Sequence, residues 1–190
     1  MSDVSSVREV LVLLLDLLDG EGVPYAVMGG LAVPIWGIPR ATFDVDVTVA
    51  VDEPTLARFL DIAIERGFEV AEPFREGFRD VLAGMNKVAM AHGAGRPGRV
   101  EVDVFVVSTP YQAAAFERRE RVRIEDREMW VLSAADVILH KLVAGRHKDR
   151  ADVQSILAVQ GVPDADYLRR WAEYLGIAES LERAIIEAGC

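Results

Sequence analysis

Three aspartates in two separate apolar runs are the residues of this sequence best suited to chemistry. Asp44 and Asp46 interrupt the run FDVDVTV, and Asp103 interrupts the run VEVDVFV. Because side chains alternate along a strand, we expect Asp44 and Asp46 on one face, and Phe43 with the valines on the buried face. Carboxylates about 5 to 7 Å apart repel each other unless a cation or a donor lies between them. The pattern therefore predicts a cation-binding edge.

Oxygen ligands without a neighbouring His or Cys favour Mg²⁺ or Mn²⁺ over zinc. If the strand of Asp103 lies beside the strand of Asp44 and Asp46, the three carboxylates could hold two metal ions. Two metals can clamp the attacking and leaving oxygens of a phosphoryl transfer. Asp103, with Glu101 on the same face as the alternative, would then take a proton from an acceptor hydroxyl.

A paired glycine, Gly29-Gly30, precedes the first aspartate run. Alone it indicates a tight turn, but its place between an expected strand and an expected helix favours phosphate binding. Residues without Cβ let backbone N–H groups approach a triphosphate closely. Arg40, four residues before Asp44, and Lys141 are candidates for neutralising phosphate charge at the edge of the cleft.

The elements that must position these residues follow from the apolar pattern. We expect strands over residues 23–28, 43–51, 67–70, 85–92, 99–107, 122–124 and 129–132. We expect helices over residues 5–19, 31–36, 54–66 and 110–119. The stretch GAGRPG between two strands is typical of a hairpin connection. The fold class is therefore α+β, with a mixed β-sheet flanked by helices.

From Ser133 onward the pattern is helical to the end of the chain. Ser133 and Asp164 are expected N-caps, and Gly161 and Gly176 are expected breaks between helices. We therefore expect a core domain over residues 1–132 and a C-terminal helical subdomain over residues 133–190. No flexible linker separates them in the sequence, so the subdomain is expected to pack on the core.

Composition restricts the class of protein. The 190 residues carry a formal net charge of −10, which disfavours a broad, non-specific grip on nucleic acid. Cys190 is the only cysteine, so no intrachain disulfide is possible, and a reducing, cytoplasmic location is expected. The first apolar run is interrupted by acids, so it is interpreted as a helix and not as a signal peptide. No stretch approaches the roughly 18 apolar residues of a membrane span.

Several motifs together resemble a known family. They are GGLA, RATFDVD, VDVF and, further along the chain, HKLVAGRHKDRADV. In order and spacing they resemble the nucleotidyltransferase superfamily with the DNA polymerase beta-like fold. Within it, the sequence is most similar to small bacterial nucleotidyltransferases of the abortive-infection toxin kind and their uncharacterised relatives. The first motifs cover residues 25–49, and the pattern K-L-x-A-x-R-x-K-D-x-x-D covers residues 141–152.

The resemblance implies a nucleotidyltransferase core and specific residue roles. Two strand aspartates and a third carboxylate bind metal in that superfamily, paired glycines hold nucleotide phosphates, and a basic residue on a later helix reaches the nucleotide. By resemblance, these roles fall on Asp44, Asp46, Asp103, Gly29, Gly30 and Lys141. One departure is that this chain has Gly-Gly where many members have Gly-Ser, so a hydroxyl that often contacts the phosphates is absent.

The implied reaction transfers a nucleoside monophosphate from an NTP to a hydroxyl and releases pyrophosphate. The acceptor could be tRNA, a protein side chain, or a small molecule such as an aminoglycoside. A second hypothesis is an NTP-binding component without chemistry, paired with an antitoxin-like protein in a two-protein defence or toxin–antitoxin system. The intact set of carboxylates argues against this second hypothesis.

Some of these features also have a purely structural interpretation. The alternating charges from Lys141 to Asp152 are equally typical of a solvated helix face with ion pairs three or four residues apart. Lys148 and Arg150 are expected to lie on such a face. Trp36 is expected in the core, although it is close enough to the glycines to form a wall of a nucleotide pocket.

Overall fold

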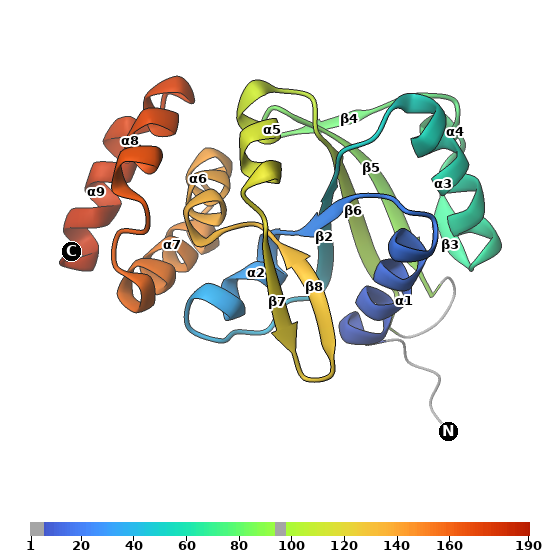
Figure 1. The fold of residues 1–190 in the computed structure, drawn as a ribbon, viewed down its shortest axis with the longest axis horizontal. Coiled ribbons are helices and arrows are strands. Elements are labelled where there is room, and N and C mark those ends of the chain that lie inside the picture. Colours follow the sequence, from blue (N-terminus) through green and yellow to red (C-terminus); the bar gives the residue numbers. More distant parts are fainter. Residues whose placement is uncertain (1–5, 94–97) are drawn as a thin grey trace.

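The computed structural model describes residues 6–93 and 98–190, and its centre is one mixed β-sheet (Figure 1). The strands are β1 (Tyr25–Val27), β2 (Asp44–Val49), β3 (Phe68–Val70), β4 (Asp80–Leu82), β5 (Met85–His92), β6 (Val100–Val106), β7 (Glu120–Ile124) and β8 (Arg127–Val131). Their order across the sheet is β3-β5-β6-β2-β1-β8-β7, with β4 paired to β5 beside this path. The predicted α+β class is confirmed.

Helices flank the sheet in two groups. The first comprises α1 (Val7–Gly20), α2 (Gly29–Trp36), α3 (Glu53–Glu65), α4 (Glu72–Arg75) and α5 (Pro110–Glu117), and the second comprises α6 (Ala134–Ala144), α7 (His147–Gln160), α8 (Ala165–Tyr174) and α9 (Ala178–Ala188). In Figure 1 the second group lies together at one end of the molecule, and α1, α3 and α4 lie at the other. None of the helices in the described ranges is long and apolar enough to cross a membrane.

The predicted hairpin is present. Strands β5 and β6 pair antiparallel, from Lys87 opposite Phe105 to His92 opposite Val100. Most of the turn between them, residues 94–97, lies outside the described residues. Helix α4 and strand β4 were not predicted, because both are short and every residue of β4 is exposed. Such a strand has no apolar alternation that would reveal it.

The prediction that Phe43 lies on the buried face of its strand is wrong. Strand β2 begins one residue later, at Asp44, and Phe43 is 82% exposed. Alternation fixes the face of a side chain only where the backbone is pleated. Within the strand it holds, since Val45, Val47 and Val49 are fully buried.

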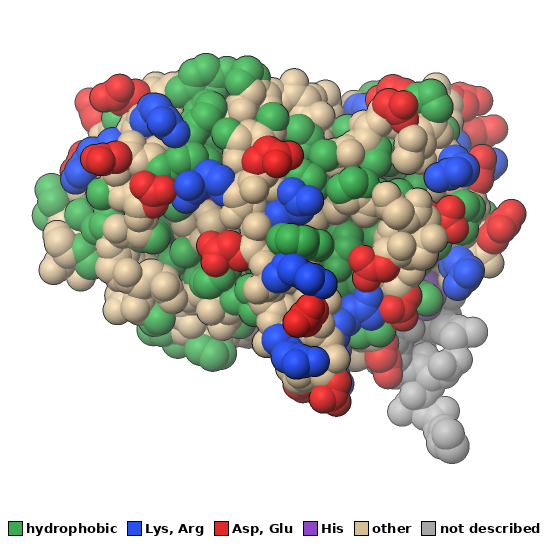
Figure 2. All heavy atoms as spheres, viewed as in Figure 1, with side chains coloured by type: hydrophobic (Ala, Val, Ile, Leu, Met, Phe, Trp, Pro, Cys, Tyr) green, Lys and Arg blue, Asp and Glu red, His purple; other side chains and the backbone are tan. Residues whose placement is uncertain are grey.

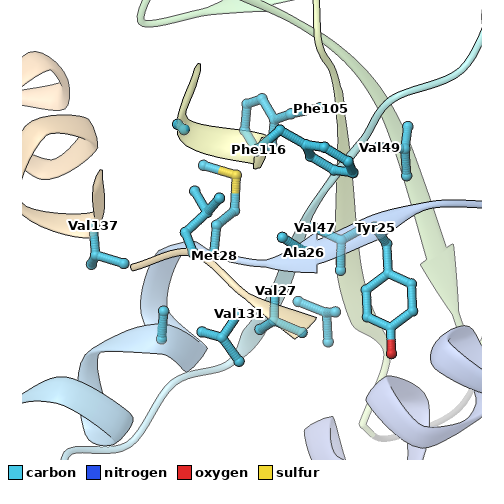
Figure 3. Close-up of a cluster of buried hydrophobic side chains, with 14 of the residues drawn as sticks. Tyr25, Ala26, Val27, Met28, Val47, Val49, Phe105, Phe116, Val131 and Val137 are labelled. Atoms are coloured by element: carbon cyan, nitrogen blue, oxygen red, sulfur yellow. The ribbon is translucent and has the colours of Figure 1, made fainter. Parts of the chain in front are cut away.

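One hydrophobic core joins residues on both sides of residue 132. Figure 3 shows part of it, with Met28, Val47, Phe105 and Phe116 from before residue 132 and Val137 of α6 from after it. Burial of this apolar surface is the main term that stabilises the fold. The domain boundary at residue 132 stays a prediction.

Figure 2 shows acidic and basic side chains mixed on the face in view.

Hydrogen bonds attach α2 and the loop after it to the C-terminal helices. The Trp36 Nε1–H donates to the Leu132 carbonyl at 2.8 Å, and the Gln160 amide donates to the Trp36 carbonyl at 3.0 Å. The Ile38 N–H donates to the Ser155 hydroxyl at 2.6 Å. Trp36 therefore fixes the position of α2, whose first residues are the paired glycines.

Candidate active site

The three predicted carboxylates come together on two central strands. Strands β2 and β6 are parallel neighbours, and their register sets Asp46 opposite Asp103 and Asp44 opposite Glu101. Asp44, Asp46 and Asp103 are half-buried and line one cavity of about 300 Å³, whereas Glu101 is exposed. The predicted adjacency of the two strands is thus confirmed, and it favours Asp103 over Glu101 as the third carboxylate of the cavity.

The paired glycines are the first residues of α2, and they lie against Asp46 of β2 and the neighbouring Thr42. A Cβ on Gly29, whose φ is +61°, would lie 1.8 Å from an Asp46 carboxylate oxygen. A Cβ on Gly30 would lie 2.3 Å from the Thr42 hydroxyl, which donates to Asp44 at 2.7 Å. A serine at position 30 would therefore collide with this threonine. In this chain a hydroxyl does lie at the Gly-Gly turn, but it comes from Thr42, a residue that sequence reasoning missed.

The charge of Asp46 is poorly solvated. Burial raises the pKa of Asp46 to about 6, and the neighbouring carboxylates of Asp44 and Asp103 add to this rise. The Gly30 backbone N–H and the Lys141 ammonium group oppose it. A cation between the carboxylates would relieve this repulsion, because an opposite charge nearby favours the ionised form.

Lys87 was not predicted as a site residue, yet it holds the third carboxylate. Its ammonium nitrogen lies 2.8 and 2.9 Å from the two oxygens of Asp103. The predicted hairpin already placed the strand of Lys87 beside the strand of Asp103, and this was the signal in the sequence that could have identified Lys87. Within the described residues, no three His, Cys, Asp or Glu side chains are grouped as metal ligands. In this structure the charge of Asp103 is balanced by Lys87.

The remaining oxygen donors fit a hard divalent cation. Asp44 and Asp46 present carboxylates from one strand face, without a His or Cys beside them, and burial and mutual repulsion raise the pKa of Asp46. Mg²⁺ and Mn²⁺ prefer such oxygen ligands. To add Asp103 as a ligand, the cation would have to displace or share the Lys87 contact.

Of the charges from Lys141 to Asp152, the buried Lys141, Asp149 and Asp152 do not lie on a solvated helix face, whereas Lys148 and Arg150 are exposed as expected. Lys141 is 5% exposed and contacts Asp149 at 3.1 Å and Asp152 at 2.9 Å. Arg40 reaches the same Asp152 with two nitrogens, at 2.5 and 2.7 Å. Although burial works against ionisation, hydrogen bonds from Arg40 and Lys141 hold the pKa of Asp152 below its usual range. Lys141 and Arg40 thus line the cavity as parts of one ion-pair network, in which Lys141 is buried and Arg40 is partly exposed.

Two further cations lie at the rim of this network. Arg146 donates to Asp149 at 2.6 Å and lines the cavity, as does the exposed Lys148. Arg150, which was expected in solvent, is exposed. Burial lowers the pKa of His140 to about 4, so this histidine of the cavity wall is neutral at pH 7.

The family assignment rests on a match over almost the whole chain. A sequence profile described as "Nucleotidyltransferase of unknown function (DUF6036)" matches residues 7–186. The chain belongs to this nucleotidyltransferase family. A comparison with curated proteins gave no significant match.

Solved structures share the fold of this nucleotidyltransferase. An antigenic nucleotidyltransferase-like protein from Paracoccidioides brasiliensis is 22% identical, with a TM-score of 0.54 over 95% of this chain and 93% of that one. ANT(2")-Ia in complex with adenylyl-2"-tobramycin is 14% identical, with a TM-score of 0.59 over 90% and 98%. The lincomycin-bound lincosamide antibiotic adenylyltransferase LnuA is 15% identical, with a TM-score of 0.56 over 83% and 99%. At these identities the likeness concerns the fold.

Proposed function

We propose that this nucleotidyltransferase transfers a nucleoside monophosphate from an NTP to a hydroxyl of a small molecule and releases pyrophosphate. The observation that carries the proposal is the parallel register that aligns Asp46 with Asp103 beneath the Gly29-Gly30 turn. The net charge of −10 disfavours an RNA acceptor, because RNA binding depends on neutralising phosphates. Two proteins of the same fold are described with antibiotics bound or modified, which favours a small acceptor.

The triphosphate is assigned to the side of the cavity formed by α2, α6 and α7. Backbone N–H groups at the start of α2 can approach phosphate oxygens because Gly29 and Gly30 carry no Cβ. Arg40, Lys141 and Arg146 add positive charge on the same side. Asp44 and Asp46 would hold Mg²⁺ or Mn²⁺, which when bound supplies charge neutralisation and polarises the reacting phosphate.

The acceptor is activated at Asp103. Its carboxylate takes the proton from the acceptor hydroxyl while the hydroxyl oxygen forms a bond to the α-phosphorus. The bond from the α-phosphorus to the bridging oxygen breaks, and pyrophosphate leaves with that electron pair. Lys87 acts as a positioning residue here, because its ammonium group on β5 contacts both oxygens of Asp103 and orients this carboxylate.

A second candidate function is NTP binding without transfer, within a two-protein system that includes an antitoxin-like partner. The Lys87–Asp103 ion pair favours it, because the ammonium group occupies both oxygens that a metal ion or an acceptor proton would use. The cavity and its cations would bind a nucleotide equally well in this case.

Incubation with each α-labelled NTP, Mg²⁺ and a fractionated cell extract distinguishes the two functions. We expect label in the small-molecule fraction with the native protein and none with Asp44→Asn or Asp46→Asn. Asp126→Asn, an exposed carboxylate change outside the cavity, is the matched control and should keep full activity. Label that persists in both site variants would contradict transfer at this site. Nucleotide binding without label in any fraction would favour the second function.

A further inference from the structure

The β4–β5 hairpin forms one wall of the catalytic cavity. Leu82 and Met85 face each other at the end of the hairpin, with Ala83 and Gly84 between them. Ala83 and Gly84 both have positive φ, 51° and 76°, as a two-residue hairpin turn of type I′ requires. Leu82, Ala83 and Met85 all line the cavity, and Leu82 is still 40% exposed. The hairpin therefore presents unfilled apolar surface to the space above the carboxylates.

This wall lies on the side of the cavity where an acceptor must enter. The hairpin continues β5, which neighbours the Asp103 strand, whereas the cations of α6 and α7 lie near Asp44 and Asp46. In phosphoryl transfer the attacking and leaving oxygens are roughly in line on opposite sides of the phosphorus. With the pyrophosphate on the side of the cations, the attacking hydroxyl approaches from Asp103 and the hairpin.

The charges around the cavity restrict the acceptor further. The only acidic side chains that line it in the described structure are the three site aspartates. The other charged side chains on its wall are cationic, and they are Arg40, Lys141, Arg146 and Lys148. A polyamine acceptor would find no further carboxylate on this lining for its ammonium groups, because Asp44 and Asp46 are assigned to the metal ion and Asp103 is paired with Lys87.

We propose that the β4–β5 hairpin is the acceptor subsite, and that the acceptor carries its hydroxyl on an uncharged, apolar body. The hairpin can be an acceptor subsite only if the protein has the proposed function. The chemical class of the acceptor and the wall that selects it go beyond that function. Contact with Leu82 and Met85 removes apolar surface of such a compound from water, which favours binding roughly in proportion to the area buried.

The test measures binding of two probe alcohols to the full-length protein with Mg²⁺ and α,β-methylene-ATP. One probe is 4-phenylbutan-1-ol, which is neutral and apolar, and the other is 2-deoxystreptamine, a diamino cyclitol. Leucine and methionine methyl NMR signals report the site and the dissociation constant. We expect the apolar alcohol to shift the signals of Leu82 and Met85, and the diamine to leave them unchanged.

Two hairpin variants make the test specific. Leu82→Ser should weaken binding of 4-phenylbutan-1-ol about fivefold, because it removes most of one apolar contact. Val81→Ser should leave it unchanged, since Val81 is 62% exposed and lies outside the cavity lining. Both positions are on the surface of β4, so both variants should fold.

Three results would overturn the inference: equal binding by the two variants, tighter binding of 2-deoxystreptamine than of the apolar alcohol, or a loss of ATP-analogue affinity in Leu82→Ser. The third would assign the hairpin to the nucleotide. Titration of 4-phenylbutan-1-ol without nucleotide separates this inference from the proposed function. Failure of the protein to bind any NTP would refute the function, while the methyl shifts would still decide the role of the hairpin.

Discussion

Replacing Asp46 by asparagine should stabilise the metal-free protein. The carboxylate of Asp46 lies beside Asp44 and Asp103, and burial together with this repulsion raises its pKa to about 6 from an ordinary value of 3.8. The asparagine side chain would keep the shape of the aspartate and an oxygen acceptor for the Gly30 N–H, but it would carry no charge. The variant therefore isolates the cost of one ionised carboxylate.

The size and sign follow from proton linkage. The folded-state pKa lies above the unfolded-state value, so the stability that protonation contributes is full below about pH 4 and is lost as pH rises through about 6. At about 1.4 kcal/mol per pH unit, the ionised Asp46 costs the fold about 3 kcal/mol at pH 8. Asp46→Asn should gain up to that amount at pH 8, and its advantage over the native protein should shrink by about 1.4 kcal/mol at pH 5.

Urea unfolding with EDTA at pH 8 and pH 5 measures this difference. Asp126→Asn corrects for the general effect of removing one negative charge from a protein of net charge −10. With Mg²⁺ and a non-hydrolysable NTP the order should reverse, because ligands that bind only the native state stabilise it. If Asp46→Asn gains no more than the control, or gains equally at both pH values, the proposed repulsion at Asp46 is wrong.

Three further substitutions test the site. Gly29→Ala should destabilise the fold by about 1–2 kcal/mol because of the positive φ alone, and by more because the new Cβ would lie 1.8 Å from an Asp46 oxygen. An unchanged thermal unfolding midpoint would contradict this geometry. Lys87→Met should tighten Mn²⁺ binding severalfold, measured by calorimetry, because it removes the cation that competes for Asp103; weaker binding would argue against competition. Asp152→Asn should lower the free energy of unfolding in urea by about 3 kcal/mol or more, because Arg40 and Lys141 lose their shared carboxylate. A decrease below about 1 kcal/mol would show that the network contributes little to stability.

Much of the fold and part of the site could be predicted from the chain itself. The valines of the β2 and β6 sequences alternate with Asp44, Asp46 and Asp103, and a pleated strand must put these two sets on opposite faces. The place of Gly29-Gly30 just after a strand, where a helix begins, is a local property too. Local backbone geometry decides such features, so the sequence by itself determined them, together with the α+β class.

Tertiary structure decided how these local pieces meet. Asp46 faces Asp103 only because β2 and β6 are parallel neighbours in one register, and that choice depends on the whole strand order. The ion pair of Lys87 with Asp103 and the contact of Arg40 with Asp152, 112 residues away, likewise need the folded sheet and helices. Side chains distant in sequence carry no local signal of their partners. These two contacts could therefore not be predicted from the sequence. They nevertheless determine how the charges of the cavity are balanced.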